Sequence, residues 1–160
     1  MSGSEIESLR SSFQRLRQQG MVPALIFYRR LFALDPALRP LFREDIEVQS
    51  QKLLNLLGQA LELLERPTQL TAVLVDLGAR HVSYGVRDQD YDTVGQALLG
   101  MLQEALGQGF TPEVRSAWTE LYGTLASTML TGATKARRAT GTAMLSSASR
   151  APSRIMAVTQ

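Results

Sequence analysis

Hydrophobic side chains recur every three or four residues along most of the first 130 positions, the spacing that places them on one face of an α-helix. The alternation of apolar and polar residues that marks a β-strand is missing, and helix-favouring residues such as Leu, Ala, Gln and Arg dominate. The pattern therefore predicts an all-α protein. It is clearest in residues 45–64 and 67–81, where the same 4, 3, 4 spacing joins two sets: Gln49, Leu53, Leu56 and Ala60, and Leu70, Leu74, Leu77 and His81.

Short local signals predict where these helices begin. Ser4 with Glu7 has the form of a capping box, in which each side chain bonds the backbone N–H of the other residue. Asp35, followed by a proline, is typical of a helix start and opens a short third helix. Thr111, again followed by a proline, opens the last long helix, whose apolar pattern ends at about residue 130. The chain is thus expected to hold about seven helices.

Length and composition fit one soluble domain. The chain has 160 residues, of which 44% are hydrophobic, and no apolar run approaches the ~20 residues that span a bilayer. The N-terminus is polar and acidic, unlike a signal peptide, and cysteine is absent, which excludes disulfides and thiolate metal sites. We therefore expect a cytoplasmic protein without a transmembrane segment.

The charge is distributed unevenly and suggests a boundary near residue 131. Residues 131–160 hold five of the 17 basic residues and none of the 15 acidic ones, so the remainder of the chain is net acidic. Large apolar residues are also few there, while Ser, Thr, Ala and Gly are frequent. We expect a helical domain over 1–131 and a basic tail over 132–160, with frayed helix up to Arg138 and disorder beyond it. The high pI of about 9.3 reflects this tail, so no nucleic-acid partner is expected.

The candidate chemistry centres on His81, the single histidine of the chain. It ends an apolar helical stripe, and neutral imidazole is a good iron ligand, used by haem proteins as a fixed axial bond. With one His and no Cys, a zinc or di-iron site built from protein alone is nearly excluded, and no phosphate loop or nucleophile motif is present. The alternative is an ordinary core or surface histidine.

Two polar residues on apolar helical faces are candidates for a site opposite His81. Gln49 stands among apolar residues, and Tyr28 lies between Phe27 and Phe32. Each could donate a hydrogen bond to a gas ligand in a dry pocket, where such bonds are strengthened. The alternatives are a solvent-facing glutamine and a core tyrosine whose hydroxyl finds a backbone carbonyl.

Several segments, in order and spacing, resemble neuroglobin, its bacterial single-domain relatives and the globin domain of flavohaemoglobins. They are residues 27–42 (FYRRLFALDPALRPLF), 77–86 (LGARHVSYGV), 92–102 (DTVGQALLGML) and 109–123 (GFTPEVRSAWTELYG). The resemblance covers roughly residues 4–130. It implies a globin fold around a pocket for haem b.

The resemblance also implies roles for individual residues. His81 falls on the proximal iron ligand, while Tyr28, Gln49 and Leu53 fall beside the gas ligand on the distal side. Lys52 and Arg80 become candidate partners of the haem propionates, although solvated surface charge is the simpler interpretation of both. The expected contacts with the haem are Phe42, Lys52, Leu53, Leu77, Arg80, Val86, Tyr91 and Val94.

The sequence departs from both relatives. Gln49 stands where neuroglobin has a distal histidine, and no second histidine exists, so closure of the iron by two histidines is impossible. The tail is far too short for the flavin and nicotinamide domains of flavohaemoglobins. Tyr91 matches the proximal tyrosine of flavohaemoglobins, but their glutamate position falls near Ala133, which argues against strong proximal activation of peroxide chemistry.

These features predict reversible, tight binding of dioxygen, and also of carbon monoxide and nitric oxide, for oxygen scavenging or storage or for nitric oxide detoxification. Nitric oxide dioxygenase activity would require an external reductase, so whether the chain is an enzyme stays open. A second interpretation is a haem-based gas sensor that signals through its basic tail, around Arg137 and Arg138. A third is a helical interaction domain without cofactor. We expect a monomer or a weak homodimer.

Overall fold

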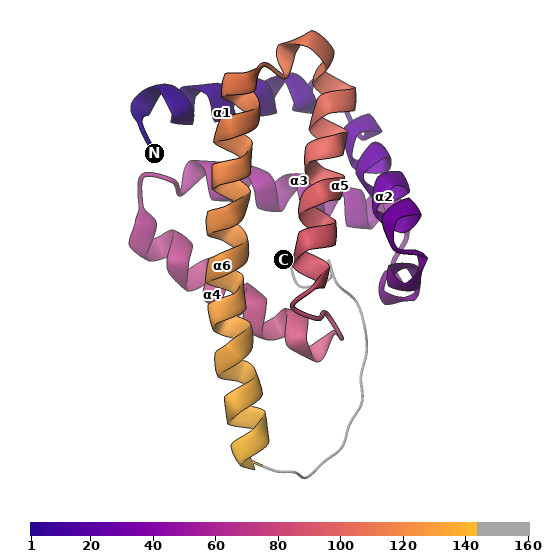
Figure 1. Ribbon diagram of the computed structural model, residues 1–160, viewed down its shortest axis with the longest axis vertical. Helices are drawn as coiled ribbons and strands as arrows, with labels where there is room; N and C mark the ends of the chain where they lie inside the picture. Colours follow the sequence, from indigo (N-terminus) through magenta and orange to yellow (C-terminus); the bar gives the residue numbers. More distant parts are fainter. Residues whose placement is uncertain (144–160) are drawn as a thin grey trace.

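The computed structural model describes residues 1–143, with side chains up to residue 140, as helices joined by short turns (Figure 1). No strand occurs among these residues, which confirms the all-α prediction. The elements are α1 (Gly3–Arg17), α2 (Val22–Leu34), the 3-10 helix η1 (Pro36–Leu41), α3 (Ile46–Glu62), α4 (Pro67–Ser83), α5 (Asp90–Leu106), the 3-10 helix η2 (Gly107–Gly109) and α6 (Pro112–Ala143).

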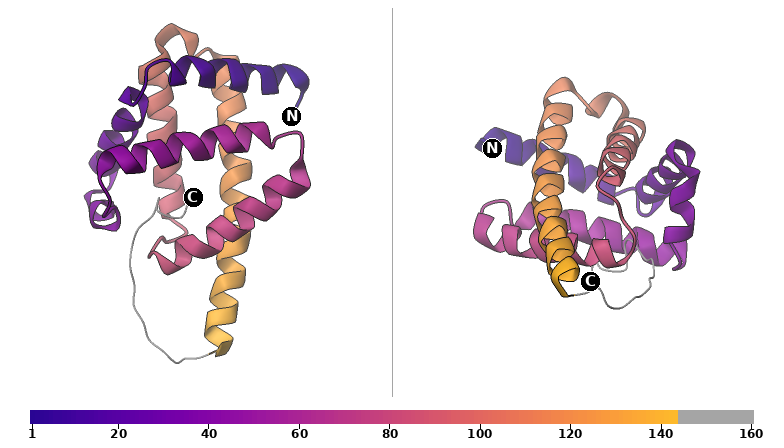
Figure 2. Two further views of the ribbon diagram at one scale, coloured as in Figure 1. Left: turned by 180° about the vertical axis from the view of Figure 1, so that it is seen from behind. Right: turned by 60° about the horizontal axis from the view of Figure 1, so that its bottom comes forward.

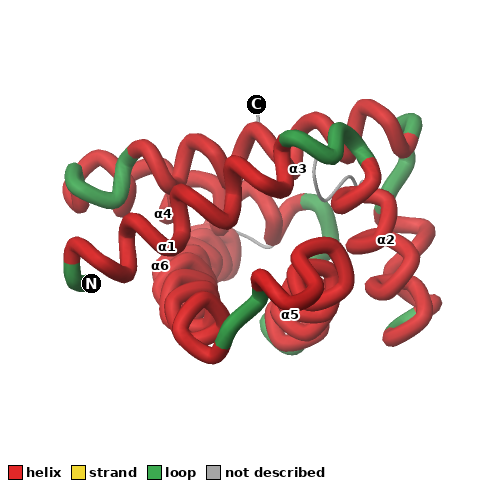
Figure 3. Tube along the Cα trace, turned by 90° about the horizontal axis from the view of Figure 1, so that it is seen from above, coloured by secondary structure: helices red, strands yellow, loops and turns green. Residues whose placement is uncertain are grey.

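The helices are arranged in two crossing groups. Helices α5 and α6 lie side by side, while α1, α3 and α4 cross them on one side (Figures 1 and 2). Seen end-on, α5 and α6 form one layer, α3 and α4 lie in the other, and α2 stands beside α5 (Figure 3). The most extensive packing is of α4 on α6 and of α2 on α5. The space enclosed by these crossings is where the candidate site lies.

The helix starts follow the local signals, with one shift. Asp35 accepts a hydrogen bond from the backbone N–H of Ala37 at 3.1 Å, and Thr111 caps the start of α6 in the same way. The capping box of α1, however, is formed by Ser2 and Glu5 and not by Ser4 and Glu7. The two pairs have the same spacing, and the extended backbone at Ser2, where the helix begins, determines which pair caps it.

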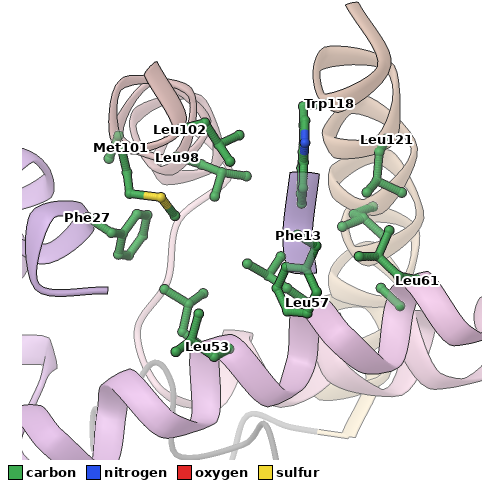
Figure 4. Close-up of a cluster of buried hydrophobic side chains, with 14 of the residues drawn as sticks. Phe13, Phe27, Leu53, Leu57, Leu61, Leu98, Met101, Leu102, Trp118 and Leu121 are labelled. Carbon is green, nitrogen blue, oxygen red and sulfur yellow. The ribbon is translucent and has the colours of Figure 1, made fainter. Parts of the chain in front are cut away.

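The core is built by the apolar stripes of all the long helices. Figure 4 shows Leu53, Leu57 and Leu61 of α3 below the side chains of α5 and α6, with Trp118 above Phe13. Trp118 is fully buried, and its indole N–H donates to the hydroxyl of Ser12 at 2.9 Å, so the buried polar atom is satisfied. Burial of these stripes stabilises the crossings that enclose the site.

Helix α6 is longer than the sequence predicts. It continues past the expected end near residue 130 to Ala143, so residues 132–143, expected in the tail, are helical. Ala133 is 1% exposed, and Arg137 pairs with Asp88 at 2.6 Å. The disorder expected for residues 144–160 lies outside the described residues. None of the described helices is long and apolar enough to cross a membrane.

Candidate functional site

An apolar cavity lies where α2, α3, α4, α5 and α6 come together. Its enclosed volume is about 100 Å³. The polar residues in its wall are His81, Asp90, Tyr91 and Tyr122. The apolar residues are Phe27, Leu31, Leu38, Phe42, Leu53, Leu56, Leu57, Ala60, Leu74, Val86, Val94, Leu98, Leu125, Ala126 and Met129.

His81 enters this cavity from the last turn of α4 with its ring held in one orientation. Its Nδ1 lies 2.8 Å from the carbonyl oxygen of Leu77, one turn earlier. Because a carbonyl only accepts, Nδ1 carries the proton and Nε2 carries the lone pair. Burial lowers the pKa of His81 to about 4, so the ring is neutral near pH 7. Among the described residues no hydrogen bond engages Nε2, so this nitrogen is free to act as a metal ligand.

Two glycines allow the helix that carries His81 to lie directly against α6. A Cβ atom added at Gly78 of α4 would overlap the carbonyl of Met129, and one added at Gly132 of α6 would overlap the carbonyl of Val75. The two backbones therefore touch one turn before His81. This contact places His81 in the cavity wall, because any side chain at either glycine would push α4 away.

A short loop and the start of α5 form the wall next to His81. The backbone N–H of Val86 donates to the carbonyl of His81 at 3.1 Å. The carboxylate of Asp90, 2% exposed, accepts from the backbone N–H of Arg87 at 2.8 Å and from its guanidinium at 2.9 Å. These bonds fix the loop that follows α4. Sequence reasoning did not single out Asp90 as a site residue, because its burial and its ion pair with Arg87 depend on the fold.

Two tyrosines close the same end of the cavity. Tyr122 of α6 donates its hydroxyl proton to the carbonyl oxygen of Tyr91 at 2.6 Å. The hydroxyl of Tyr91 is buried without a hydrogen-bond partner among the described residues, and burial raises the pKa of Tyr91 to about 12. Tyr91 therefore keeps its proton and has an unused donor in the cavity wall. Its role as a contact was expected, whereas Tyr122 was missed, although it lies on the apolar stripe of its helix.

Tyr28 and Gln49 are both buried but do not line the cavity. The Tyr28 hydroxyl donates to the backbone carbonyl of Gln49 at 3.1 Å, and the amide nitrogen of Gln49 donates to Glu44 at 3.0 Å. Burial raises the pKa of Tyr28, so it stays protonated. The aromatic ring of Tyr28 packs against Phe42, which does line the cavity, with centroids 5.3 Å apart. The structure thus brings both donors close to the cavity and engages them with other acceptors.

The remaining expected contacts divide into two groups. Lys52 pairs with Glu44 at 2.8 Å, Arg80 pairs with Asp76, and Leu77 is buried outside the cavity wall. The lining residues among the expected set are Phe42, Leu53, Val86, Tyr91 and Val94, with His81. The lining residues that sequence reasoning did not assign lie mostly on the apolar stripes, and periodicity alone does not show which stripe positions surround a cavity.

Comparison with known proteins explains this arrangement. A sequence model of the globin family matches residues 25–129, which include the cavity-lining residues from Phe27 to Met129. The chain belongs to the globin family. This confirms the resemblance that the sequence motifs carry, and it identifies the all-α architecture as a globin fold.

The similar proteins fall into two kinds of globin. The chain is 37% identical over 114 residues to a flavohemoprotein of Rhizobium meliloti (strain 1021), covering 69% of the chain and 28% of that protein. It is 30% identical over 146 residues to neuroglobin of Tetraodon nigroviridis and to neuroglobin-1 of Oncorhynchus mykiss, covering 82% of the chain and 92% of each. The crystal structure of the closed form of the HGbRL globin domain matches with 33% identity and a TM-score of 0.42, over 84% of this chain and 98% of that one.

Globins bind haem, and the cavity of this globin fits that group. The wall is almost wholly apolar, as a flat macrocycle requires, and it contains one imidazole whose Nε2 is free. No group of three or more His, Cys, Asp or Glu side chains that could hold a metal occurs among the described residues. An iron that arrives within a macrocycle needs only the single ligand that His81 offers. Family membership and cavity together support haem-based binding of gas ligands.

Proposed function

We propose that this globin binds haem b through Nε2 of His81 and uses it to bind dioxygen reversibly, and also carbon monoxide and nitric oxide. The observation that carries the proposal is His81 itself: a neutral, oriented imidazole with a free nitrogen in the wall of an apolar cavity. When bound, haem supplies the iron that takes the gas ligand. The chain supplies orientation, exclusion of water and hydrogen-bond donors.

The partner of His81 favours ligand binding over oxidative chemistry. The Nδ1 proton is donated to the carbonyl of Leu77, which fixes the ring and makes Nε2 a better ligand. This acceptor is a neutral carbonyl and not a carboxylate, and the buried carboxylate in the same wall, Asp90, is engaged by Arg87. His81 therefore stays a neutral imidazole, which suits oxygen scavenging or storage.

The hydrogen-bond donors Tyr28 and Gln49 are the reason that we expect a high affinity for dioxygen. Tyr28 keeps its proton because burial raises its pKa, and its hydroxyl lies in an apolar, aromatic surrounding. In such surroundings a hydrogen bond to a partly negative ligand is stronger than in water. A donor contact with dioxygen requires Tyr28 or Gln49 to exchange its present acceptor for the ligand.

Nitric oxide dioxygenation is a second candidate, favoured by the 37% identity to a flavohemoprotein. In that reaction nitric oxide, dioxygen and one electron give nitrate, so an electron donor is needed. The present chain matches 28% of the flavohemoprotein's length, and we propose that an external reductase supplies the electron.

Optical absorption spectra test the haem proposal directly. We expect the purified protein to show a Soret band that shifts on reduction and shifts again with carbon monoxide. His81→Gly should lose or alter this spectrum, and added imidazole should restore it by replacing the missing ligand. A chain that takes up no haem after reconstitution would overturn the proposal and favour a cofactor-free helical interaction domain. A spectrum unchanged in His81→Gly would show that iron is bound without His81.

A further inference from the structure

The joint between η1 and α3 holds a partly buried ion pair that also engages Gln49. One carboxylate oxygen of Glu44 accepts from the amide nitrogen of Gln49 at 3.0 Å and from the ammonium group of Lys52 at 2.8 Å. The side chains of Glu44 and Lys52 are 26% and 18% exposed, and Gln49 is fully buried. Two donor side chains, those of Gln49 and Lys52, therefore share one acceptor atom of Glu44.

The chemistry of a carboxylate determines which way the Gln49 amide points. A carboxylate only accepts hydrogen bonds, so the amide must present its NH2 group to Glu44. The amide oxygen of Gln49 is then buried without a partner among the described residues. An unsatisfied buried acceptor is unfavourable, so the Glu44 contact holds Gln49 in an orientation that it would not keep by itself.

We propose that Glu44, held in place by Lys52, is a latch that controls whether Gln49 can donate a hydrogen bond to the gas ligand. The proposal rests on the proposed function. With the latch closed, the amide nitrogen of Gln49 donates to Glu44, and the Gln49 side chain is not part of the cavity wall. With the latch open, the amide is free to turn and donate into the cavity. Glu44 is thus a positioning residue that acts on the ligand through Gln49.

The arrangement predicts that removing the Glu44 carboxylate slows dioxygen release, because the Gln49 amide then becomes free to donate to the ligand. Glu44→Ala should slow release by about fivefold, the factor that corresponds to one ordinary hydrogen bond. Gln49→Leu should release dioxygen at nearly the wild-type rate, because the closed latch already keeps Gln49 from the ligand, and Glu44→Ala should have no further effect in a Gln49→Leu background. Glu44→Gln, whose amide oxygen can still accept from Gln49, should behave nearly as wild type.

The experiment combines rates with two spectroscopic readouts on the haem-loaded, carbon monoxide form. The first is the side-chain amide NMR signal of Gln49, assigned by its loss in Gln49→Leu. The second is the infrared stretching frequency of carbon monoxide, which falls when a donor approaches the ligand. Glu44→Ala should shift both, whereas Glu47→Ala should shift neither. Glu47 is a matched control because it is exposed on α3, the helix that carries Gln49. Its replacement by alanine changes the net charge by the same amount as Glu44→Ala.

The outcomes separate the latch from the haem site. A haem-loaded Glu44→Ala protein with an unchanged amide signal and carbon monoxide frequency would overturn the latch alone. The same would follow if Glu44→Ala changed dioxygen release equally with and without Gln49. A chain that binds no haem would overturn the proposed function and, with it, any role of Glu44 in gas binding.

Discussion

At the scale of single residues, the buried neutral His81 makes the haem-free protein sensitive to acid. In the unfolded chain the imidazole takes up a proton near its ordinary pKa of 6.5, whereas burial lowers the pKa in the folded chain to about 4. Between these values the unfolded state binds more protons, so stability falls as the pH falls. We expect a loss of about 2 kcal/mol in the free energy of unfolding between pH 7 and pH 5.

Urea unfolding of the haem-free protein at several pH values measures this effect. His81→Gln keeps a polar side chain but cannot take up the proton, so its stability should change much less over the same range. Equal pH dependence in the two proteins would show that His81 is already protonated, or exposed, in the folded state.

The Tyr28 hydroxyl donates to the backbone carbonyl of Gln49, and we propose that it also donates to the gas ligand. Tyr28→Phe removes the hydrogen bond to the carbonyl of Gln49, which should cost about 1 kcal/mol of stability. If the hydroxyl also turns to the ligand, as proposed, dioxygen should leave about fivefold faster. Laser photolysis and stopped-flow mixing measure the release rate, and thermal unfolding measures the stability. Lower stability with an unchanged release rate would confine Tyr28 to its structural contact.

At the scale of helices, the backbone contact between α4 and α6 fixes the position of His81. Gly132→Ala would place a methyl group against the carbonyl of Val75, so we expect it to destabilise the protein by about 1–3 kcal/mol and to weaken haem retention. Gly123→Ala, in the same helix, meets no atom within 4 Å and should be neutral or stabilising by up to about 1 kcal/mol. Thermal unfolding and the rate of haem transfer to an acceptor protein measure both effects.

The two glycine variants should differ in haem retention as well as in stability. If Gly132→Ala behaved like Gly123→Ala in both measurements, the helices would not be in backbone contact at this point, and another interaction would have to hold α4.

The helices also show how far the sequence predicts the structure. Prolines and capping residues act locally, so the starts at Asp35 and Thr111 are readable from the sequence. The end of α6 is not, because large apolar residues are missing from 132–143 and no apolar stripe marks a buried face there, although Gly132 and Ala133 make tertiary contacts. The residues that line the cavity are also not predictable from periodicity alone. Periodicity identifies the buried face of each helix, but the way the helices cross determines which residues of that face line the cavity.

Side-chain partners were the hardest features to predict. Gln49 and Tyr28 were singled out because they are polar residues on apolar helical faces, and their role as donors to the gas ligand stays a prediction. Their actual acceptors, Glu44 and a backbone carbonyl, depend on rotamers and on the shape of the joint before α3. No spacing rule relates Glu44 to Gln49, so the latch is a feature that only the structure reveals.

At the scale of the whole molecule, the extension of α6 connects the C-terminal region to the side of the cavity that carries His81. Arg137 pairs with Asp88 in the loop that follows His81, and Gly132 and Ala133 pack on the described core. A boundary at residue 131 would therefore cut through a packed helix. A boundary after Ala143 would leave every described contact in place.

Two truncations test this boundary and the sensor interpretation together. Removal of residues 132–160 should destabilise the protein and weaken haem retention, because it deletes the packed part of α6 and the Arg137–Asp88 pair. Removal of residues 144–160 alone should leave stability and gas binding unchanged, as expected for a segment rich in Ser, Ala and Arg. Unfolding temperature and dioxygen dissociation rate are the measurements.

A changed dissociation rate in the shorter truncation, at unchanged stability, would mean that the basic tail is coupled to the haem site and that the chain is a gas sensor. An unchanged rate restricts gas binding to the helical body, where Arg137 holds the proximal loop without transmitting a signal.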